Sequence, residues 1–370
     1  MIAAVAGDPL RTPLCELLGI DLPILLGPMA GGPGTPALAG AVSAAGGLGF
    51  VGVTMLAPDA TAEAVREAVL LSGGRPIGVN VQLARPKPGA GTREALRGHM
   101  APLRRELELP EEGPEPPAEG TAPVAAAELV RIGLEAGATV VSTALGDPGE
   151  LAEMTRSARV PIVAAVSSVD EARRAEAAGA AAIVAQGWEA GGHRTTFEVG
   201  ETPLPAVGTL ALVPQVVDAV GVPVIAAGGI ADGRGLAAAL ALGAQGAMIG
   251  TRFLLAEEAG TTPAHREAVA ALADTDTFVT DAVTGRAARW ARNRLAGSMA
   301  EGPPPLGWGP AQRAEIADVA RAAAVAGRTD LMPVLAGQAA GLDPRVLPAA
   351  EIVEAIASRA RAVLRALSPE

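Results

Sequence analysis

Eight short apolar runs, separated by alanine-rich amphipathic stretches, dominate the sequence between residues 23 and 250. Strands that are buried on both faces of a sheet read as continuous apolar segments, which is the pattern of parallel α/β sheets. The runs occupy residues 23–26, 48–52, 77–81, 139–142, 161–166, 181–185, 223–227 and 246–250. Eight strand–helix units within about 250 residues predict an α/β fold, a (β/α)₈ TIM barrel.

The segments between the runs carry signals for helix starts and stops. Residues 35–47 begin with a capping threonine, Thr35, followed by a proline that suits the first turn, and they end at a glycine pair. Residues 168–179 carry acidic residues near their start, and residues 231–243 carry Asp232 near theirs, where we expect it to cap the helix. The alternation of strand and helix therefore has local support along the chain.

Two stretches depart from this alternation. Residues 85–123 are rich in Pro, Glu and Gly, which favours an insertion or a partly disordered loop over a strand. Beyond residue 260, alanine and arginine alternate in a mainly helical pattern. We therefore predict a barrel over residues 1–260, with an insertion at about 86–123, and a helical C-terminal segment over 261–370 that packs near the active site.

Charge and cysteine content narrow the class of partner. The net charge is −11 and the isoelectric point is about 5.0, so nucleic acid is not an expected partner. The single cysteine, Cys15, excludes an intrachain disulfide and fits the reducing cytoplasm. Residues 22–58 lack charge but are broken by Gly and Pro, so we expect no membrane span, and three scattered histidines predict no metal site.

Glycine-bearing turns follow the seventh and eighth runs. Gly228 and Gly229 follow the seventh run, and Gly250 and Thr251 follow the eighth. In a TIM barrel these two loops commonly bind phosphate, because glycine lets backbone N–H groups approach an anion closely. The alternative is that the glycines only close tight turns. Two such turns on strands expected to be adjacent favour phosphate binding.

The loop after the sixth run, "QGWEAGGHRTTF", contains the candidate base. Gly191 and Gly192 leave room for a flat ligand, and His193 follows them at the expected strand end. A histidine can accept or donate a proton near neutral pH, which suits general acid–base catalysis. The alternative is a loop histidine bonded to backbone. His99 and His265 are expected to be ordinary solvated residues.

Two further positions at strand ends could face a ligand. Met29, in "GPMAGG" after the first run, could lie beside a flat ring or fill the core. Asn80, near the end of the third run, would point into the barrel mouth. Its amide could bind a cofactor edge or substrate, or could be a satisfied polar group of the barrel interior.

Six ordered blocks of the sequence resemble the nitronate monooxygenase (2-nitropropane dioxygenase) family. They are "PILLGPMAGGPGTPALAGAVSAAGGLGF", "IGVNVQL", "AQGWEAGGHRTTF", "PVIAAGGIADGRGLAAALALGAQGAMIGTRF", "AVTGRAARWARNRL" and "LAGQAAGL". The resemblance implies an FMN-binding barrel in which His193 is the catalytic base. It implies oxidation of alkyl nitronates or nitroalkanes, with O₂, to carbonyl compounds and nitrite.

The resemblance also implies which residues contact FMN. The expected cofactor-binding residues are Gly27, Pro28, Met29, Asn80, Gln186, Gly187, Gly191, Gly192, Ala227, Gly228, Gly229, Gly250, Thr251 and Gln338. The expected partners are a small nitro or nitronate substrate and O₂, and a homodimer is compatible with the sequence. The chain departs from some relatives, which carry Lys at the end of the fifth strand, and it has Thr195 where a glycine is common.

Four other functions share part of this pattern. A flavin-type enoyl-ACP reductase that uses NAD(P)H has similar glycine motifs, and its acidic carrier protein would need a basic patch. The arginines at 286, 289, 292 and 294 could form that patch, although a solvated helix face is the default interpretation. A specialised biosynthetic flavin oxidoreductase and a non-catalytic flavin-binding protein also remain open. An IMP dehydrogenase requires a catalytic cysteine in a barrel loop. That function is rejected because the single cysteine, Cys15, precedes the first strand.

Overall fold

The computed structural model describes residues 8–114, 124–200 and 204–367. Within them, one sheet holds eight parallel strands in the order β1-β10-β9-β7-β6-β5-β3-β2. A parallel bridge between Leu25 and Leu48 joins the two ends of this sheet and closes the barrel. The strands are β1 Ile24–Leu26, β2 Gly49–Gly52, β3 Ile77–Gln82, β5 Val140–Ala144, β6 Ile162–Val166, β7 Ala182–Gln186, β9 Val224–Ala227 and β10 Gly246–Ile249. Each predicted apolar run forms a strand, so the predicted (β/α)₈ fold is confirmed.

Helices cover the outside of the barrel. Thr35 caps α2 by accepting a hydrogen bond from the Leu38 N–H, and Asp232 caps α9 through the N–H groups of Arg234 and Gly235. Both caps are as predicted from the sequence. The helices of this layer are α2 Pro36–Ala44, α3 Pro58–Leu71, α5 Ala126–Glu135, α6 Ala152–Ala158, α7 Val169–Ala177, α8 Thr209–Val217 and α9 Gly233–Ala241. A short 3₁₀ helix, η1 Pro148–Leu151, precedes α6.

The barrel interior is filled by small and aliphatic side chains. Leu14, Cys15 and Leu18 of α1 (Pro13–Leu18) share a buried cluster with inward-facing strand residues such as Phe50 and Met248. Helix α1 therefore plugs the amino end of the barrel. The buried side chains of Asn80 and Ser142 hydrogen-bond to each other between β3 and β5, and in this fold the chemistry lies at the carboxyl ends of the strands.

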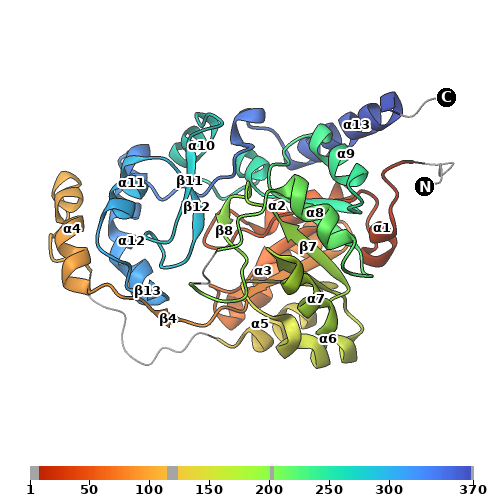
Figure 1. Ribbon diagram of the computed structural model, residues 1–370, viewed down its shortest axis with the longest axis horizontal. Helices are drawn as coiled ribbons and strands as arrows, with labels where there is room; N and C mark the ends of the chain where they lie inside the picture. Colours follow the sequence, from red (N-terminus) through yellow and green to blue (C-terminus); the bar gives the residue numbers. More distant parts are fainter. Residues whose placement is uncertain (1–7, 115–123, 201–203, 368–370) are drawn as a thin grey trace.

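A second hydrophobic core lies beside the barrel and joins two distant parts of the chain. Leu96 and Met100 of α4 (Arg93–Glu106) pack with Trp290, Leu295 and Val319 from the C-terminal part. Figure 1 shows α4 next to α11 and α12 at the left of the molecule, away from the barrel helices. The other elements here are β4 Lys87–Pro88, η2 Thr251–Leu255, α10 Pro263–Ala270, β11 Thr277–Thr280, β12 Ala288–Ala291, α11 Arg294–Glu301, β13 Gly307–Trp308 and α12 Pro310–Val325, with the short η3 Thr329–Leu331 and η4 Ala340–Leu342 following.

The two stretches that depart from the alternation contain more structure than their composition suggests. The segment expected to be an insertion or loop contains β4 and α4, and residues 115–123 lie outside the described part. The segment expected to be helical contains β11, β12 and β13 as well as helices. Strand β12 runs between two antiparallel partners, β11 and β8, so pairing overrides the helical preference of its Ala and Arg residues. The boundary at residue 260 stays a prediction.

The last helix returns to the barrel. Helix α13 (Ala349–Leu367) packs along α9 and α2, and its residues Ile352, Val353 and Ile356 belong to the barrel core. A Cβ at Gly233, in the first turn of α9, would lie 2.3 Å from the Ala360 backbone nitrogen. Glycine at this position therefore permits the close contact between the two helices.

Candidate active site

The turns after β1 and β10 pack against each other at the carboxyl end of the barrel. The Gly27 N–H donates to the Ile249 carbonyl at 2.7 Å. A Cβ on Gly27 would lie 3.0 Å from the Gly250 Cα. This closeness brings the "GPM" segment, with Pro28 and Met29, against the predicted phosphate turn. The half-buried Met29 contacts both hydrophobic cores, so its side chain also serves as packing.

The turns after β9 and β10 leave backbone donors without protein acceptors. Gly228 and Gly229 have positive φ angles of 101° and 72°, which favour glycine. Among the described residues, the N–H groups of Gly229, Gly250 and Thr251 have no backbone or side-chain acceptor. The direction in which a Cβ of Gly250 would project is open, with no atom within 4 Å. Exposed donors beside open space fit an anionic group such as a phosphate.

Two of the three predicted amide ligands, Asn80 and Gln186, form side-chain hydrogen bonds within the protein. Asn80 is buried, and its Nδ2 donates to the carbonyl and hydroxyl of Ser142 at 3.3 and 3.1 Å. This agrees with a satisfied barrel-interior amide. Gln186 donates from Nε2 to the His193 carbonyl at 3.0 Å and accepts from the Thr195 N–H at 3.0 Å. Gln186 thus orders the loop that carries His193.

Residues at the base of the same loop provide close packing. The Gly187 N–H donates to the Ala227 carbonyl at 2.8 Å, which links the ends of β7 and β9. A Cβ on Gly187 would lie 2.0 Å from the Thr209 hydroxyl. Glu189 accepts hydrogen bonds from the N–H and hydroxyl of Thr209. Gly187 is therefore required by the turn itself.

His193 lies in a short strand, β8 (Gly192–His193), that pairs antiparallel with β12. Its Nε2 is 2.9 Å from the Thr284 hydroxyl oxygen. Two buried indole rings wall the imidazole in edge contacts, Trp308 with a centroid separation of 5.0 Å and Trp290 at 6.3 Å. The preceding Gly192 has φ 78° and open space where a Cβ would project. The ring is thus held by the protein, and the glycine that precedes it adjoins open space.

The surroundings of His193 keep its ring neutral. Burial, which is the largest cause, and the positive charges of Arg286 and Arg313 together lower the pKa of His193 from its ordinary 6.5 to about 3. The side chain is half-buried, and the walls that remove it from water are mostly aromatic. A neutral imidazole has a free lone pair, so His193 is in the form that accepts a proton.

Three buried arginines hold the loop that carries His193. Arg194 donates to the carbonyls of Gly187 and Gln186 at 2.7 and 2.9 Å. Arg289 donates to the Trp188 carbonyl at 2.7 Å, and Arg286 donates to the Thr196 carbonyl and hydroxyl. The expectation of a solvated helix face at 286–294 is therefore wrong for Arg286 and Arg289, because each is 2% exposed and the segment includes strand β12.

The C-terminal segment reaches the site at the predicted "LAGQ" block. The Gln338 N–H donates to the Glu189 carbonyl at 3.0 Å, and the Gly337 N–H donates to the Thr251 hydroxyl at 2.9 Å. A Cβ on Gly191 would lie 2.5 Å from the Gly337 nitrogen. The tail therefore spans from the β7 loop to the β10 turn. The Gln338 side chain is exposed.

The other two histidines are not ordinary solvated residues. His99 is half-buried, and its Nε2 lies 2.9 Å from the Ser298 carbonyl and 3.0 Å from the Ser298 hydroxyl. Burial lowers the pKa of His265, whose Nε2 has no partner in the described residues. Their expected exposure was wrong because both segments pack into the second core. Both lie away from the barrel strands and do not join His193.

Several residues of the site carry no sequence signal that predicts their position. Thr284, Trp290, Trp308 and Arg313 surround His193 but lie 91 to 120 positions after it. Two of the three tryptophans of the chain meet at this histidine. The rarity of tryptophan is the one feature of the sequence that could have drawn attention to Trp290 and Trp308, but it does not predict where they lie.

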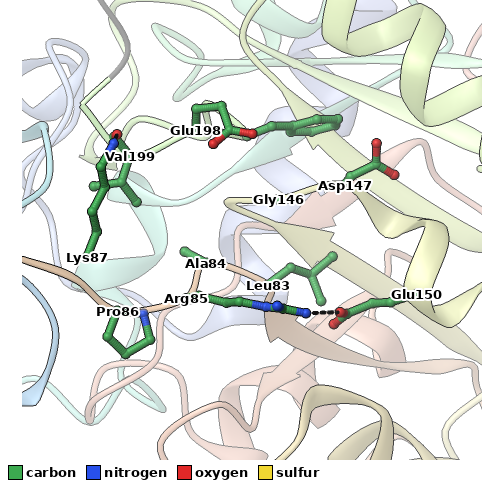
Figure 2. Close-up of a pocket in the computed structure, with 11 residues that line it drawn as sticks. Leu83, Ala84, Arg85, Pro86, Lys87, Gly146, Asp147, Glu150, Glu198 and Val199 are labelled. Atoms are coloured by element: carbon green, nitrogen blue, oxygen red, sulfur yellow. Dashed lines mark hydrogen bonds and ion pairs between the residues drawn. The ribbon is translucent and has the colours of Figure 1, made fainter.

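A cavity of about 350 Å³ adjoins this region without containing His193. Figure 2 shows its walls, which come from the segments after β3 and β5 and from residues 197–199 after the His193 loop. Lys87 extends along it to the Val199 carbonyl, and Arg85 approaches Glu150 across it. Lys87 also pairs in register with Trp308. The short β4–β13 sheet therefore links this cavity to the histidine.

The described part of the chain contains neither a candidate metal-binding cluster nor a candidate membrane-spanning helix. No group of three or more potential metal-ligating side chains is found in residues 8–114, 124–200 and 204–367. No helix in those ranges is both long and apolar enough to cross a membrane.

Comparison with known proteins supports the resemblance. Residues 11–358 match the nitronate monooxygenase family. A probable nitronate monooxygenase from Staphylococcus aureus is 35% identical over 327 residues, which cover 88% of this chain and 90% of the relative. One from Staphylococcus saprophyticus is 35% identical over 295 residues, which cover 79% of this chain and 81% of the relative.

Solved structures lead to the same group. A nitroalkane oxidase from Streptomyces ansochromogenes is 35% identical with a TM-score of 0.86, covering 96% of this chain and 99% of that one. FabK from Thermotoga maritima is 33% identical with a TM-score of 0.75, covering 96% and 98%. The barrel, the glycine-rich turns and the sequence match agree, and the chain belongs to the nitronate monooxygenase family.

Proposed function

We propose that the protein is an FMN-dependent oxidoreductase that converts alkyl nitronates and nitroalkanes, with O₂, to carbonyl compounds and nitrite. The observation that carries this proposal is a neutral histidine, His193, beside open glycine backbone at the carboxyl end of the barrel. Family membership supports the reaction class. The nitroalkane oxidase named among the structural relatives supports a nitro compound as substrate.

The residues of the strand ends fit a flavin mononucleotide. Gly228, Gly229, Gly250 and Thr251 would hold the phosphate, because three of their N–H groups lack protein acceptors. The flat ring would lie near residues 27–29 and 191–192. When bound, the flavin supplies the oxidising chemistry, and the protein supplies orientation and the proton path. The segment 261–370 would complete the site through residues 337–338.

His193 would take the α-proton of a neutral nitroalkane. The Thr284 hydroxyl lies 3.3 Å from the Arg286 carbonyl, to which it donates. It therefore accepts a hydrogen bond from a protonated Nε2 of His193, and Nδ1 keeps the lone pair. No described group hydrogen-bonds Nδ1, so this atom is available to the substrate. The C–H bond breaks, the proton moves to Nδ1, and the electron pair stays on the substrate as the nitronate.

Rapid mixing distinguishes this function from the alternative of an NAD(P)H-dependent reductase. The purified protein would be mixed anaerobically with propyl nitronate and, separately, with NADH or NADPH, while flavin absorbance is followed. We expect rapid reduction by the nitronate and little response to the pyridine nucleotides. Rapid reduction by NADH or NADPH alone would replace the proposal with a reductase.

The His193→Ala variant tests the base. We expect it to keep the yellow cofactor and to lose about 10²- to 10⁴-fold in kcat/KM for nitroethane, the usual loss for a general base. Ethyl nitronate has already lost its α-proton, so its turnover should fall far less. Steady-state oxygen consumption with the two substrates measures the difference. Equal activity of the variant and the wild type on nitroethane would refute the assignment of the base.

A further inference from the structure

Arg313 occupies an unusual position beside His193. It lies in the first turn of α12, and its guanidinium carbon is 5.6 Å from the centroid of the Trp308 ring. The same ring is in edge contact with His193 at a centroid separation of 5.0 Å. The charge of Arg313 acts directly on the imidazole. The guanidinium, the indole and the imidazole therefore form one cluster of rings and charge.

Arg313 differs from the other arginines near the site in its partners. Arg194, Arg286 and Arg289 each donate to backbone carbonyls and thereby hold the His193 loop. Among the described residues, Arg313 has no hydrogen bond and no ion pair, although its side chain is half-buried. A guanidinium carries five N–H donors, and removing them from water without an acceptor is unfavourable. The ring of Trp308 offsets part of this cost but accepts no strong hydrogen bond.

We propose that Arg313 is the anion-recognising residue of the substrate pocket and selects substrates that carry negatively charged oxygen atoms. This inference deepens the proposed function, because a nitronate carries its negative charge on the two oxygens of the nitro group. The planar guanidinium fork matches two such oxygens. The same chemistry would also bind a carboxylate elsewhere on a substrate. A nitronate and a nitroalkane that share one carbon skeleton and carry no carboxylate separate these two kinds of anionic group.

A bound anion would also change the base. The charged groups that act on His193 are Arg286 and Arg313, and its other close neighbours, Thr284, Trp290 and Trp308, are uncharged. Pairing Arg313 with an anion removes part of the positive field that disfavours the imidazolium. The nitronate formed from a nitroalkane would therefore stabilise the proton that His193 has just accepted.

The test uses sodium nitrite as the anion probe and ethyl nitronate with nitroethane as the matched substrates. Nitrite would be titrated into the holoenzyme at constant ionic strength while tryptophan fluorescence is followed, because Trp308 lies against Arg313. Loss of a charge-assisted hydrogen bond predicts about 10- to 100-fold weaker nitrite binding in Arg313→Gln. The KM for ethyl nitronate should rise similarly, while the KM for nitroethane changes less than about threefold.

Two further variants control for structure. Arg313→Lys keeps the charge and should bind nitrite with intermediate affinity. Arg292→Gln removes an exposed arginine that lies 5.0 Å from the ring centroid of Phe278 and should behave as the wild type. Undiminished nitrite binding in Arg313→Gln, or absence of nitrite binding by the wild type, would overturn the proposal. So would an equal rise in KM for both substrates or equal losses in both arginine variants.

The nitrite titration requires no turnover, so it separates this proposal from the proposed function. A protein that binds nitrite through Arg313 but does not oxidise nitronates would refute the function and leave the anion site standing. If the wild type oxidises nitronates and Arg313→Gln has an unchanged KM for them, the anion site is refuted and the proposed function stands. Because ethyl nitronate and nitroethane carry no carboxylate, a selective rise in the KM of ethyl nitronate assigns the contact to the oxygens of the nitro group.

Discussion

At the scale of single residues, the site depends on a histidine whose ordinary chemistry is altered by its neighbours. Burial and two guanidinium groups lower the pKa of His193 to about 3. Thr284 fixes the ring through Nε2, and two indoles limit its rotation. The cost is a weak base, since a low pKa also means low proton affinity. Formation of an anion in the pocket would offset that cost, because it counters the nearby positive charge.

The lowered pKa has a consequence for the pH dependence of activity. A base is active when unprotonated, so a depressed pKa moves the acid limb of the profile to lower pH. We expect kcat/KM for nitroethane to remain level from about pH 8 to about pH 5, below the ordinary histidine pKa of 6.5. Arg313→Gln should move the limb upward by removing one cation. Initial rates in constant-ionic-strength buffers measure both profiles, and a wild-type limb near pH 6.5 would contradict the expectation.

At the scale of elements, the site is assembled from turns whose glycines have different roles. Gly187 and Gly191 are needed because neighbouring chain segments lie where a side chain would be. Gly250 is different, because open space surrounds the Cβ direction and its φ of −107° suits any residue. The fold therefore does not require glycine at position 250, and the absence of a side chain there leaves space for a ligand.

Substitution of Gly250 separates ligand space from stability. Gly250→Ala should leave the unfolding temperature of the apoprotein unchanged within about 2 °C, because nothing in the protein meets the added methyl group. It should weaken FMN binding by about tenfold or more, since one lost contact of about 1.4 kcal/mol is a tenfold change. Gly297→Ala, at an equally open position within α11, is the matched control. The flavin-to-protein absorbance ratio and a titration of apoprotein measure the binding, and full affinity in Gly250→Ala would remove Gly250 from the phosphate site.

At the scale of the whole molecule, the second core depends on a buried charge cluster between distant segments. Glu315 of α12 is 1% exposed and lies 3.1 Å from Arg93, 2.9 Å from Arg97 and 3.9 Å from Arg104 of α4. Arg104 is fully buried and also pairs with Asp318 at 2.9 Å. These contacts attach the Pro-rich stretch to the helix that carries Arg313.

Removing the central carboxylate should therefore destabilise the second core strongly. Glu315→Gln removes the buried carboxylate that Arg93, Arg97 and Arg104 share, and breaking a buried ion pair typically costs about 3–5 kcal/mol. Urea unfolding followed by tryptophan fluorescence measures the change, since Trp290 lies in this core. Glu150→Gln removes an exposed partner 3.9 Å from Arg85 and should change stability by less than about 0.5 kcal/mol. A loss below about 1 kcal/mol in Glu315→Gln would show that the cluster is not structurally important.

The sequence alone determined the barrel and the location of its chemistry. Eight buried strands, their order along the chain and the caps at Thr35 and Asp232 follow from apolar runs and from short-range backbone preferences. Parallel strands place their carboxyl ends together, so the residues that follow each apolar run are the candidate site residues. This rule identified His193 and the glycine turns as candidates. These inferences rest on periodicity and on contacts between residues close in sequence.

Only the tertiary structure decided what surrounds His193. The sequence left Asn80 open between a cofactor contact and a satisfied interior amide, and the resemblance implied an FMN contact for Gln186. Their hydrogen bonds to Ser142, His193 and Thr195 are visible only in the structure. Arg286 and Arg289 were expected to be exposed charges. No local sequence pattern shows that their guanidinium groups are buried and donate hydrogen bonds to the carbonyls of Thr196 and Trp188. Trp308 and Arg313 reach the histidine through packing of segments more than 100 residues away. Burial and partner choice at such distances depend on how whole elements pack, and that information is not present in any local window of sequence.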